Sequence, residues 1–154
     1  MNTLNGEITT ITTEQNISLI KALAEGRLFH SLVLDTPATS PWLKEGAPIR
    51  VLFKETEVMI ALPPDSPSPP SDPSPLRISV RNQLPCRIIA ISRGAILCEL
   101  TLSLTPDQSS SQPAASGPVI RSIITRSACE SLGLKENQDV IALIKTNEVS
   151  LAHD

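Results

Sequence analysis

The feature of this sequence that most constrains its fold is an internal repeat. Residues 2–11 match residues 82–91 through a shared Asn-x-Leu-x-x-x-Ile-x-x-Ile pattern, an offset of 80 residues. Further along, residues 43–45 and 54–61 match residues 134–136 and 145–152 at an offset of 91. The extra 11 residues fit the polar, Ser-rich stretch at 107–117. The repeat predicts two copies of one small domain, with an inserted loop in the second.

A proline-rich stretch separates the two copies. Seven of the 13 residues at 63–75 are proline, and the rest are Ser and Asp. Such a composition favours an extended polyproline II spacer over a packed core. Binding to a proline-recognition module is the alternative for this stretch. We therefore divide the chain into a first copy at 1–62, a linker at 63–76 and a second copy at 77–154.

Each copy reads mainly as β-strands. Apolar residues at 98, 100, 102 and 104 alternate with polar ones, which is the pattern of a half-buried strand. Ser127 and Glu130 stand at capping-box spacing before a Gly stop at 133, so a short helix is predicted there. Residues 39–43 hold the matching place in the first copy. The candidate strands of the second copy are 87–91, 98–104, 119–124, 140–144 and 149–151.

Five short strands and one small helix per copy predict an all-β chain with short helices. The architecture expected is two OB-like Greek-key β-barrels in tandem. Barrels of this size bury little surface when alone, so a homo-oligomer is expected as well.

Composition excludes several classes of function. Aromatic residues make up 2% of the chain and the net charge is −3, which disfavours a nucleic-acid-binding OB barrel. No Gly-rich phosphate loop, CxxC or HExxH is present, so we do not expect an enzyme. No apolar run is long enough to span a membrane, and the first residues lack the pattern of a secretion signal. Three cysteines without close spacing favour a reduced, cytoplasmic setting.

The second copy carries the most specific motifs. Residues 79–84 read Ser-Val-Arg-Asn-Gln-Leu, and residues 142–152 read Ala-Leu-Ile-Lys-Thr-Asn-Glu-Val-Ser-Leu-Ala. They resemble the opening and closing signatures of the Mop, or molbindin, domain, a molybdate-binding member of the TOBE group. Residues 124–125 and 131–134 resemble the middle region of that family. The tandem chain resembles a di-Mop protein with a degenerate first half.

The resemblance implies that molybdate or tungstate binds at subunit interfaces, with no organic cofactor and no protein atom ligating the metal directly. The family's usual Ser position is Ala128 here, beside Ser127. In the first copy Met1 stands in place of Arg81 and Leu34 in place of Thr125, and only Lys54 is retained. That copy is expected to be structural or to hold a partial site. The residues implied for oxyanion binding are Ser79, Val80, Arg81, Asn82, Thr125, Ser127, Lys145 and Thr146.

These residue types suit a tetrahedral dianion, which must exchange its water shell for hydrogen-bond donors. Backbone N–H groups at 79–82, hydroxyl groups, the Lys145 ammonium and a helix N-terminus near Ser127 would supply them. Each residue also has an ordinary alternative. Arg81 and Lys145 read equally as surface charges, Asn82 as a turn former paired with Asn2, Ser127 as a helix cap, and Thr125 as a strand residue.

The function expected from the sequence is intracellular binding, storage or homeostasis of molybdate, without catalysis. A trimer is the favoured assembly and a dimer the alternative. A second hypothesis is a molybdate-sensing interaction module that works with a separate regulator or transporter ATPase. Direct partners among nucleic acids or membranes are not expected.

Overall fold

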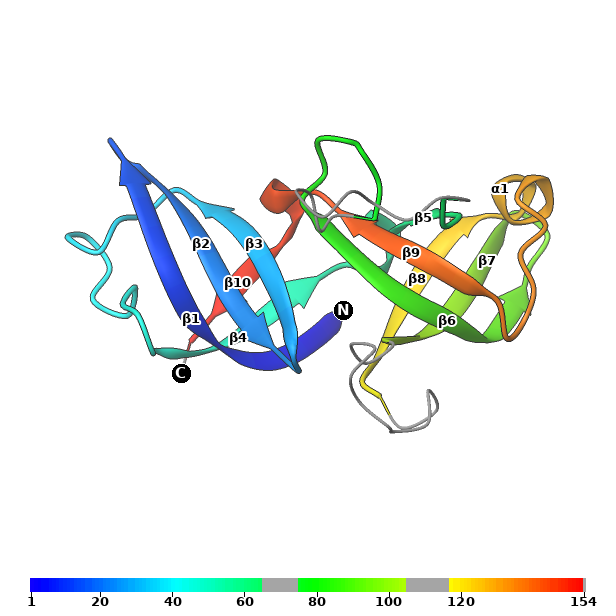
Figure 1. Cartoon of the computed structure of the whole chain (residues 1–154), viewed down its shortest axis with the longest axis horizontal. Helices are drawn as coiled ribbons and strands as arrows, with labels where there is room; N and C mark the ends of the chain where they lie inside the picture. The colour runs from blue at the N-terminus through cyan, green and yellow to red at the C-terminus, as the bar shows by residue number, and fades with distance from the viewer. Residues whose placement is uncertain (65–74, 105–116, 154) are drawn as a thin grey trace. The chain divides into compact units, whose positions relative to one another are not determined.

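The computed structural model describes residues 1–64, 75–104 and 117–153, shown as the coloured ribbon in Figure 1. The predicted linker and inserted loop therefore lie mostly outside the described residues. No helix among these residues is long and apolar enough to cross a membrane. The strands are β1 Asn2–Glu14, β2 Ile17–Ala24, β3 Arg27–Val33, β4 Pro48–Phe53, β5 Met59–Ala61, β6 Asn82–Arg93, β7 Leu97–Leu104, β8 Val119–Thr125, β9 Asp139–Ile144 and β10 Ser150–Ala152. The helical elements are α1 Arg126–Ser131 and two 3-10 turns, η1 Glu55–Glu57 and η3 Thr146–Glu148.

The strands form two five-stranded antiparallel sheets, in the orders β10-β4-β1-β2-β3 and β5-β9-β6-β7-β8. The central strand of each sheet carries an irregularity at the same place, between Ile8 and Thr10 in β1 and between Ile88 and Ala90 in β6. The offset of 80 seen in the sequence is thus repeated in the register. The predicted fold class, all-β with short helices and two OB-like barrels, is confirmed.

The two compact units of the structure differ from the two halves of the sequence. Unit 1 comprises Met1–Lys54 together with residues from Lys145 onward, and unit 2 comprises Glu55–Ile144. The short strand β5 of the first half pairs with β9, and β10 of the second half pairs with β4 (Figure 1). Each barrel therefore takes its last strand from the other half, which boundaries drawn at 62 and 77 do not capture.

A pair of buried serines fixes the exchanged segments. In unit 1 the Ser31 hydroxyl donates to the backbone carbonyl of Val149 at 2.5 Å. In unit 2 the Ser122 hydroxyl donates to the carbonyl of Val58 at 2.7 Å. Both serines and both valines are buried, and each pair of counterparts is separated by the same 91-residue offset. Since a buried carbonyl without a partner is costly, these bonds favour the exchanged arrangement in both units.

Aliphatic side chains fill both barrels. In β7 the residues at 98, 100, 102 and 104 are all buried, as the alternation predicts. Unit 1 adds the two phenylalanines, Phe29 and Phe53, whose ring centroids lie 5.9 Å apart. The scarcity of aromatic residues is therefore no obstacle to a core of this kind.

The helix prediction is right in one copy and wrong in the other. Helix α1 is followed by Gly133 at φ +63°, whose N–H donates to the Glu130 carbonyl, so the predicted Gly stop is confirmed. The predicted helix at 39–43 is absent, and turns occupy this stretch. Pro41 has no N–H, so a helix could hold it only in its first turn, and the chain turns again at Gly46 (φ +83°), which leaves too few residues for a regular helix.

Candidate functional site

The loop before β6 carries three of the predicted site residues and is held by Gln83. The Gln83 side-chain amide donates to the carbonyls of Leu76 and Val80, at 3.1 and 2.8 Å. Its oxygen accepts the Leu76 N–H at 2.8 Å. One side chain thus spans the loop from residue 76 to residue 80 and fixes how the chain enters β6.

Arg81 is also turned onto this loop. Its guanidinium donates to the carbonyls of Ile78 and Ser79, and the side chain is otherwise exposed. The structure therefore assigns Arg81 a positioning role within the loop.

The consequence is a defined direction for three successive N–H groups. Side chains hold the carbonyls of Ile78, Ser79 and Val80, and the chain contains no cis peptide among the described residues. In a trans peptide the C=O and the following N–H point in opposite directions. The N–H groups of Ser79, Val80 and Arg81 therefore point away from the side chains that hold the carbonyls.

Asn82 begins β6 and is fully buried. It pairs with Ile144, the last residue of β9. The residue after Ile144 is Lys145. The end of the loop, at Arg81, and Lys145 therefore each adjoin one residue of this pair, which joins adjacent strands. Burial at a strand start fits the structural alternative for Asn82, and its repeat partner Asn2 is buried at the start of β1 as well.

Thr125 lies at the junction of β8 and α1 and caps the helix. Its hydroxyl accepts the Ala128 N–H at 3.1 Å, while Ser127 lies exposed in the first turn. The helix cap is therefore Thr125 and not Ser127 as predicted, while Thr125 is also the last residue of β8, as the strand alternative has it. A hydroxyl that accepts one hydrogen bond keeps its own proton to donate. The Arg126 N–H already donates to the Ile96 carbonyl, so the helix start offers fewer free donors than predicted.

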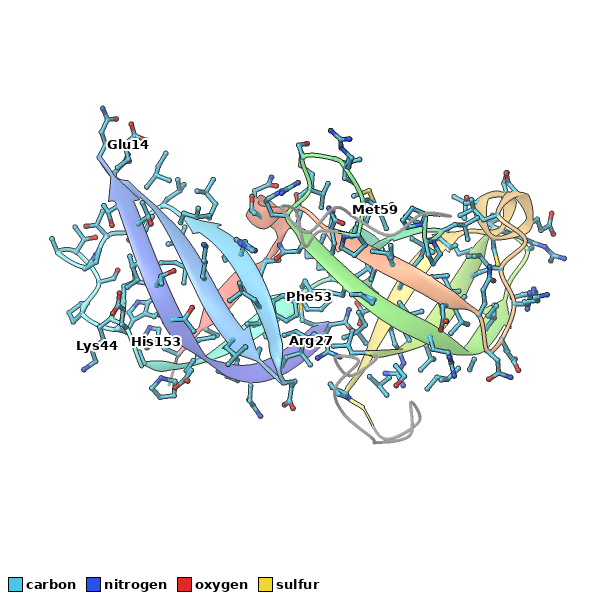
Figure 2. The ribbon with its side chains drawn as sticks, viewed as in Figure 1. Glu14, Arg27, Lys44, Phe53, Met59 and His153 are labelled. Atoms are coloured by element: carbon cyan, nitrogen blue, oxygen red, sulfur yellow. The ribbon has the colours of Figure 1, made fainter. Side chains whose placement is uncertain are left out.

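An apolar groove of about 570 Å³ adjoins Thr125 in unit 2. Exposed apolar side chains border it, among them Met59, labelled in Figure 2, and Leu97, which are 44% and 52% exposed. A charged ligand at Thr125 would therefore lie next to an apolar surface, which another protein surface can cover. The groove is lined by Thr56, Val58, Met59, Ile60, Leu97, Ile123, Ile124, Thr125, Ala128 and Leu132.

The predicted residues occupy three segments. Residues 79–82 and the Thr125–Ser127 junction belong to unit 2, whereas Lys145 and Thr146 belong to unit 1. Lys145 is exposed, Thr146 is half-buried, and the Lys145 carbonyl accepts the Glu148 N–H of η3 at 3.0 Å.

The first copy retains Lys54 but has apolar residues where the candidate site has its arginine and its capping threonine. Met1 and Leu34 are exposed, and β3 ends at Val33 without a capped helix behind it. Lys54 is exposed and is the last residue of the first segment of unit 1. Its counterpart Lys145 is also exposed and is the first residue of the second segment. In the described part of the chain no cluster of three or more His, Cys, Asp or Glu is placed to hold a metal ion.

Sequence reasoning missed two features of the site region. Gln83 occupies an unassigned position of the Asn-x-Leu repeat pattern, and only the structure shows its three bonds to the loop. The serine pair could have been found, because Ser31 and Ser122 share the 91-residue offset of the later repeat segments.

Comparisons with known proteins agree with one another. The TOBE domain family matches residues 78–151. The chain is 32% and 33% identical, each over 76 residues, to molybdenum-pterin-binding proteins 3 and 1 of Clostridium pasteurianum, with 49% of this chain and 97% of each relative covered. Among solved structures, the cytoplasmic molybdate-binding protein ModG, with molybdate bound, matches 99% of this chain and 96% of its own, with a TM-score of 0.79 and 26% identity.

Proposed function

Because the chain belongs to the TOBE-domain family of the molybdenum-pterin-binding proteins, we propose that it binds molybdate reversibly as an intracellular store or buffer. The observation that carries this proposal is the match to molybdate-bound ModG over both units. The matches to the molybdenum-pterin-binding proteins cover 49% of this chain, whereas the match to ModG covers 99% of it.

The loop at 76–81 is the first component of the proposed site. The peptides that carry the N–H groups of Ser79, Val80 and Arg81 are each held through their carbonyls, two of them by Arg81 and one by Gln83. A tetrahedral dianion needs several donors at once, and pre-oriented backbone N–H groups bind it without a further ordering cost. In this proposal Arg81 positions the loop and its charge adds to the local positive potential.

Hydroxyl groups and an ammonium complete the donor set. Thr125 keeps a proton to donate, Ser127 stands beside it in place of the serine missing at Ala128, and Lys145 supplies the compensating charge. Thr146 follows Lys145 and adds a second hydroxyl. No soft ligand is required, because the metal of an oxyanion is already saturated by oxygen. Tungstate has the same shape and charge and is expected to compete.

We further propose that the sites are completed between subunits of a homo-oligomer, with a trimer favoured over a dimer. The apolar groove beside Thr125 and the exposed leucines of unit 1 at positions 23, 28 and 32 support self-association. Light scattering after size-exclusion chromatography gives the assembly directly. A monomer at micromolar concentration would contradict this part of the proposal.

Equilibrium dialysis against molybdate, with molybdenum measured by mass spectrometry, tests the function. Wild-type protein is expected to show saturable uptake that sulfate does not displace at equal concentration. The double variant Arg81→Ala/Lys145→Ala is expected to lose at least about tenfold in affinity. Loss of the Lys145 ammonium removes a charged hydrogen bond of about 1.5–3 kcal/mol, and loss of Arg81 releases the loop that orients the N–H groups.

The matched control is Arg87→Ala/Lys135→Ala, which removes two positive charges from unit 2, one at the half-buried Arg87 and one at the exposed Lys135. The side chains of the Arg87–Asp139 ion pair are 41% and 62% exposed, so solvent screens the pair and it contributes little. Equal affinity in the two double variants, or no saturable uptake by the wild type, would refute the proposal. Recovery of a transporter ATPase or regulator from cell extract only in the presence of molybdate would favour the sensing role over storage.

A further inference from the structure

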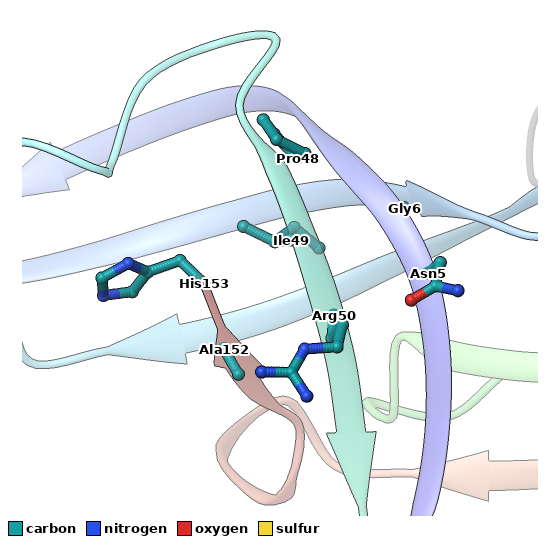
Figure 3. A pocket seen from close by; sticks show the side chains of 7 residues that line it. All are labelled: Asn5, Gly6, Pro48, Ile49, Arg50, Ala152 and His153. Atoms are coloured by element: carbon teal, nitrogen blue, oxygen red, sulfur yellow. The ribbon is translucent and has the colours of Figure 1, made fainter.

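A pocket of about 220 Å³ lies on unit 1, and none of the residues proposed for molybdate lines it (Figure 3). Its floor is a row of directly paired residues across three strands. Asn5 of β1 pairs with Arg50 of β4, and Arg50 pairs with Ala152 of β10. The small side chain of Ala152 leaves space beside the guanidinium, and His153 stands at the end of the row (Figure 3).

The same row in unit 2 is apolar. The positions equivalent by register are Pro85, Ile141 and Ala61, which pair across β6, β9 and β5. At the offset of 91, His153 corresponds to Leu62 and Trp42 to Gly133. The barrel fold therefore does not require an amide, a guanidinium and an imidazole at this place. These polar groups belong to unit 1 alone.

A second hollow of about 340 Å³ continues from the first and shares Pro48 and His153 with it. Trp42 stacks on His153, with ring centroids 4.5 Å apart and planes inclined by 14°. Lys44 also lines this hollow and adds a second permanent positive charge. Among the described residues that line the two hollows, Arg50 and Lys44 carry positive charge and none is Asp or Glu; Glu7, paired with Pro48, is an acidic residue of the neighbouring row.

We propose that this surface, the Arg50–His153 pocket, binds a small organic anion. A carboxylate or phosphate head would lie on the Arg50 guanidinium, with the Asn5 amide and the His153 imidazole as further donors. A flat body would cover Pro48 and the Trp42–His153 wall. The planar guanidinium fork suits two-oxygen acceptors, and rings and prolines suit a flat apolar body. The proposal is independent of molybdate binding, because none of the residues assigned to molybdate lines either hollow.

Trp42 makes the test direct, because it is the single tryptophan of the chain. Its fluorescence is followed while phenyl phosphate, benzoate, inorganic phosphate and benzyl alcohol are added separately to the full-length protein. We expect a saturable change with phenyl phosphate or benzoate, weaker binding of inorganic phosphate, and no saturable change with neutral benzyl alcohol. Which of the two ring compounds binds identifies the preferred head group.

Arg50→Ile installs the residue that unit 2 carries at the same register position, and unchanged thermal unfolding verifies the fold. Its affinity is expected to fall at least about tenfold, from loss of a hydrogen-bonded charge. The matched control Arg27→Ala removes another guanidinium from unit 1, one that donates to the Gly26 carbonyl, and should stay within about twofold of wild type. No saturable change with either ring compound, or equal affinity of Arg50→Ile and wild type, would overturn the proposal.

Discussion

Replacing Gln83 with methionine tests whether the loop at 76–81 is pre-organised for anion binding. Methionine has nearly the same length and retains the packing of a half-buried side chain, but it can neither donate nor accept the three bonds. Those bonds join the Gln83 amide to the Leu76 carbonyl, the Val80 carbonyl and the Leu76 N–H. At a net value of about 0.5–1.5 kcal/mol for each of three neutral bonds, the free energy of unfolding should fall by about 1.5–4.5 kcal/mol.

The effect on molybdate affinity follows from the same bonds. Fixing the backbone of one residue costs about 1–2 kcal/mol. A loop released at residues 79–80 would have to recover that order on binding, which corresponds to about tenfold weaker affinity for each residue re-ordered. Urea unfolding and equilibrium dialysis measure the two quantities on the same preparation.

Gln138→Met is the matched control. Gln138 also holds a turn in unit 2, where its side-chain oxygen accepts the Lys135 N–H at 3.0 Å. We expect a loss of at most about 1 kcal/mol in unfolding free energy and molybdate affinity within about twofold of wild type. If Gln83→Met binds molybdate as tightly as Gln138→Met does, the pre-organised loop is not what binds the anion.

Three further predictions follow from the geometry. Ser31→Ala and Ser122→Ala should each lower the free energy of unfolding by about 1–3 kcal/mol in urea titrations, because each leaves a buried valine carbonyl unpaired; an effect at only one of them would contradict the symmetric arrangement. Thr125→Val should cost about 0.5–2 kcal/mol through loss of the cap and should weaken molybdate binding, whereas Thr125→Ser should restore both. Burial, together with the neighbouring Cys98, raises the pKa of the Cys129 thiol, so the native thiol should resist alkylation at pH 8. Because the unfolded chain loses that proton first, the free energy of unfolding should fall as the pH rises through about 8.5, and Cys129→Ala should flatten the fall.

The fold class could be predicted because several levels of the sequence agree. The repeat predicts two similar sheets, the alternation in β7 predicts which side chains are buried, and Gly133 predicts the end of the helix. The structure confirms all three. The resemblance to the Mop and TOBE family is confirmed as well. The exchange of β5 and β10 could not be predicted, because a three-residue strand carries the same pattern whichever sheet it joins. Long-range bonds such as Ser31 to Val149 decide that question.

The residues of the candidate site come from motifs, and their part in binding stays a prediction. Their contacts within the protein could not be predicted, because these depend on backbone geometry that a motif does not encode. Arg81 reads as a ligand in sequence and lies on its own loop carbonyls in the structure. Thr125 reads as a strand residue and caps α1. The Arg50–His153 pocket gave no sequence signal, because its residues are separated by up to 148 positions and meet only through strand register.

The most direct test of molybdate binding is to locate molybdenum by anomalous scattering in crystals of the full chain grown with molybdate. The account predicts an anion within hydrogen-bond distance of the N–H groups of residues 79–81, with the Lys145 ammonium or the Thr125 hydroxyl of the same or a neighbouring subunit completing its shell. Molybdenum bound elsewhere on an ordered protein, or absent at saturating concentration, would contradict it.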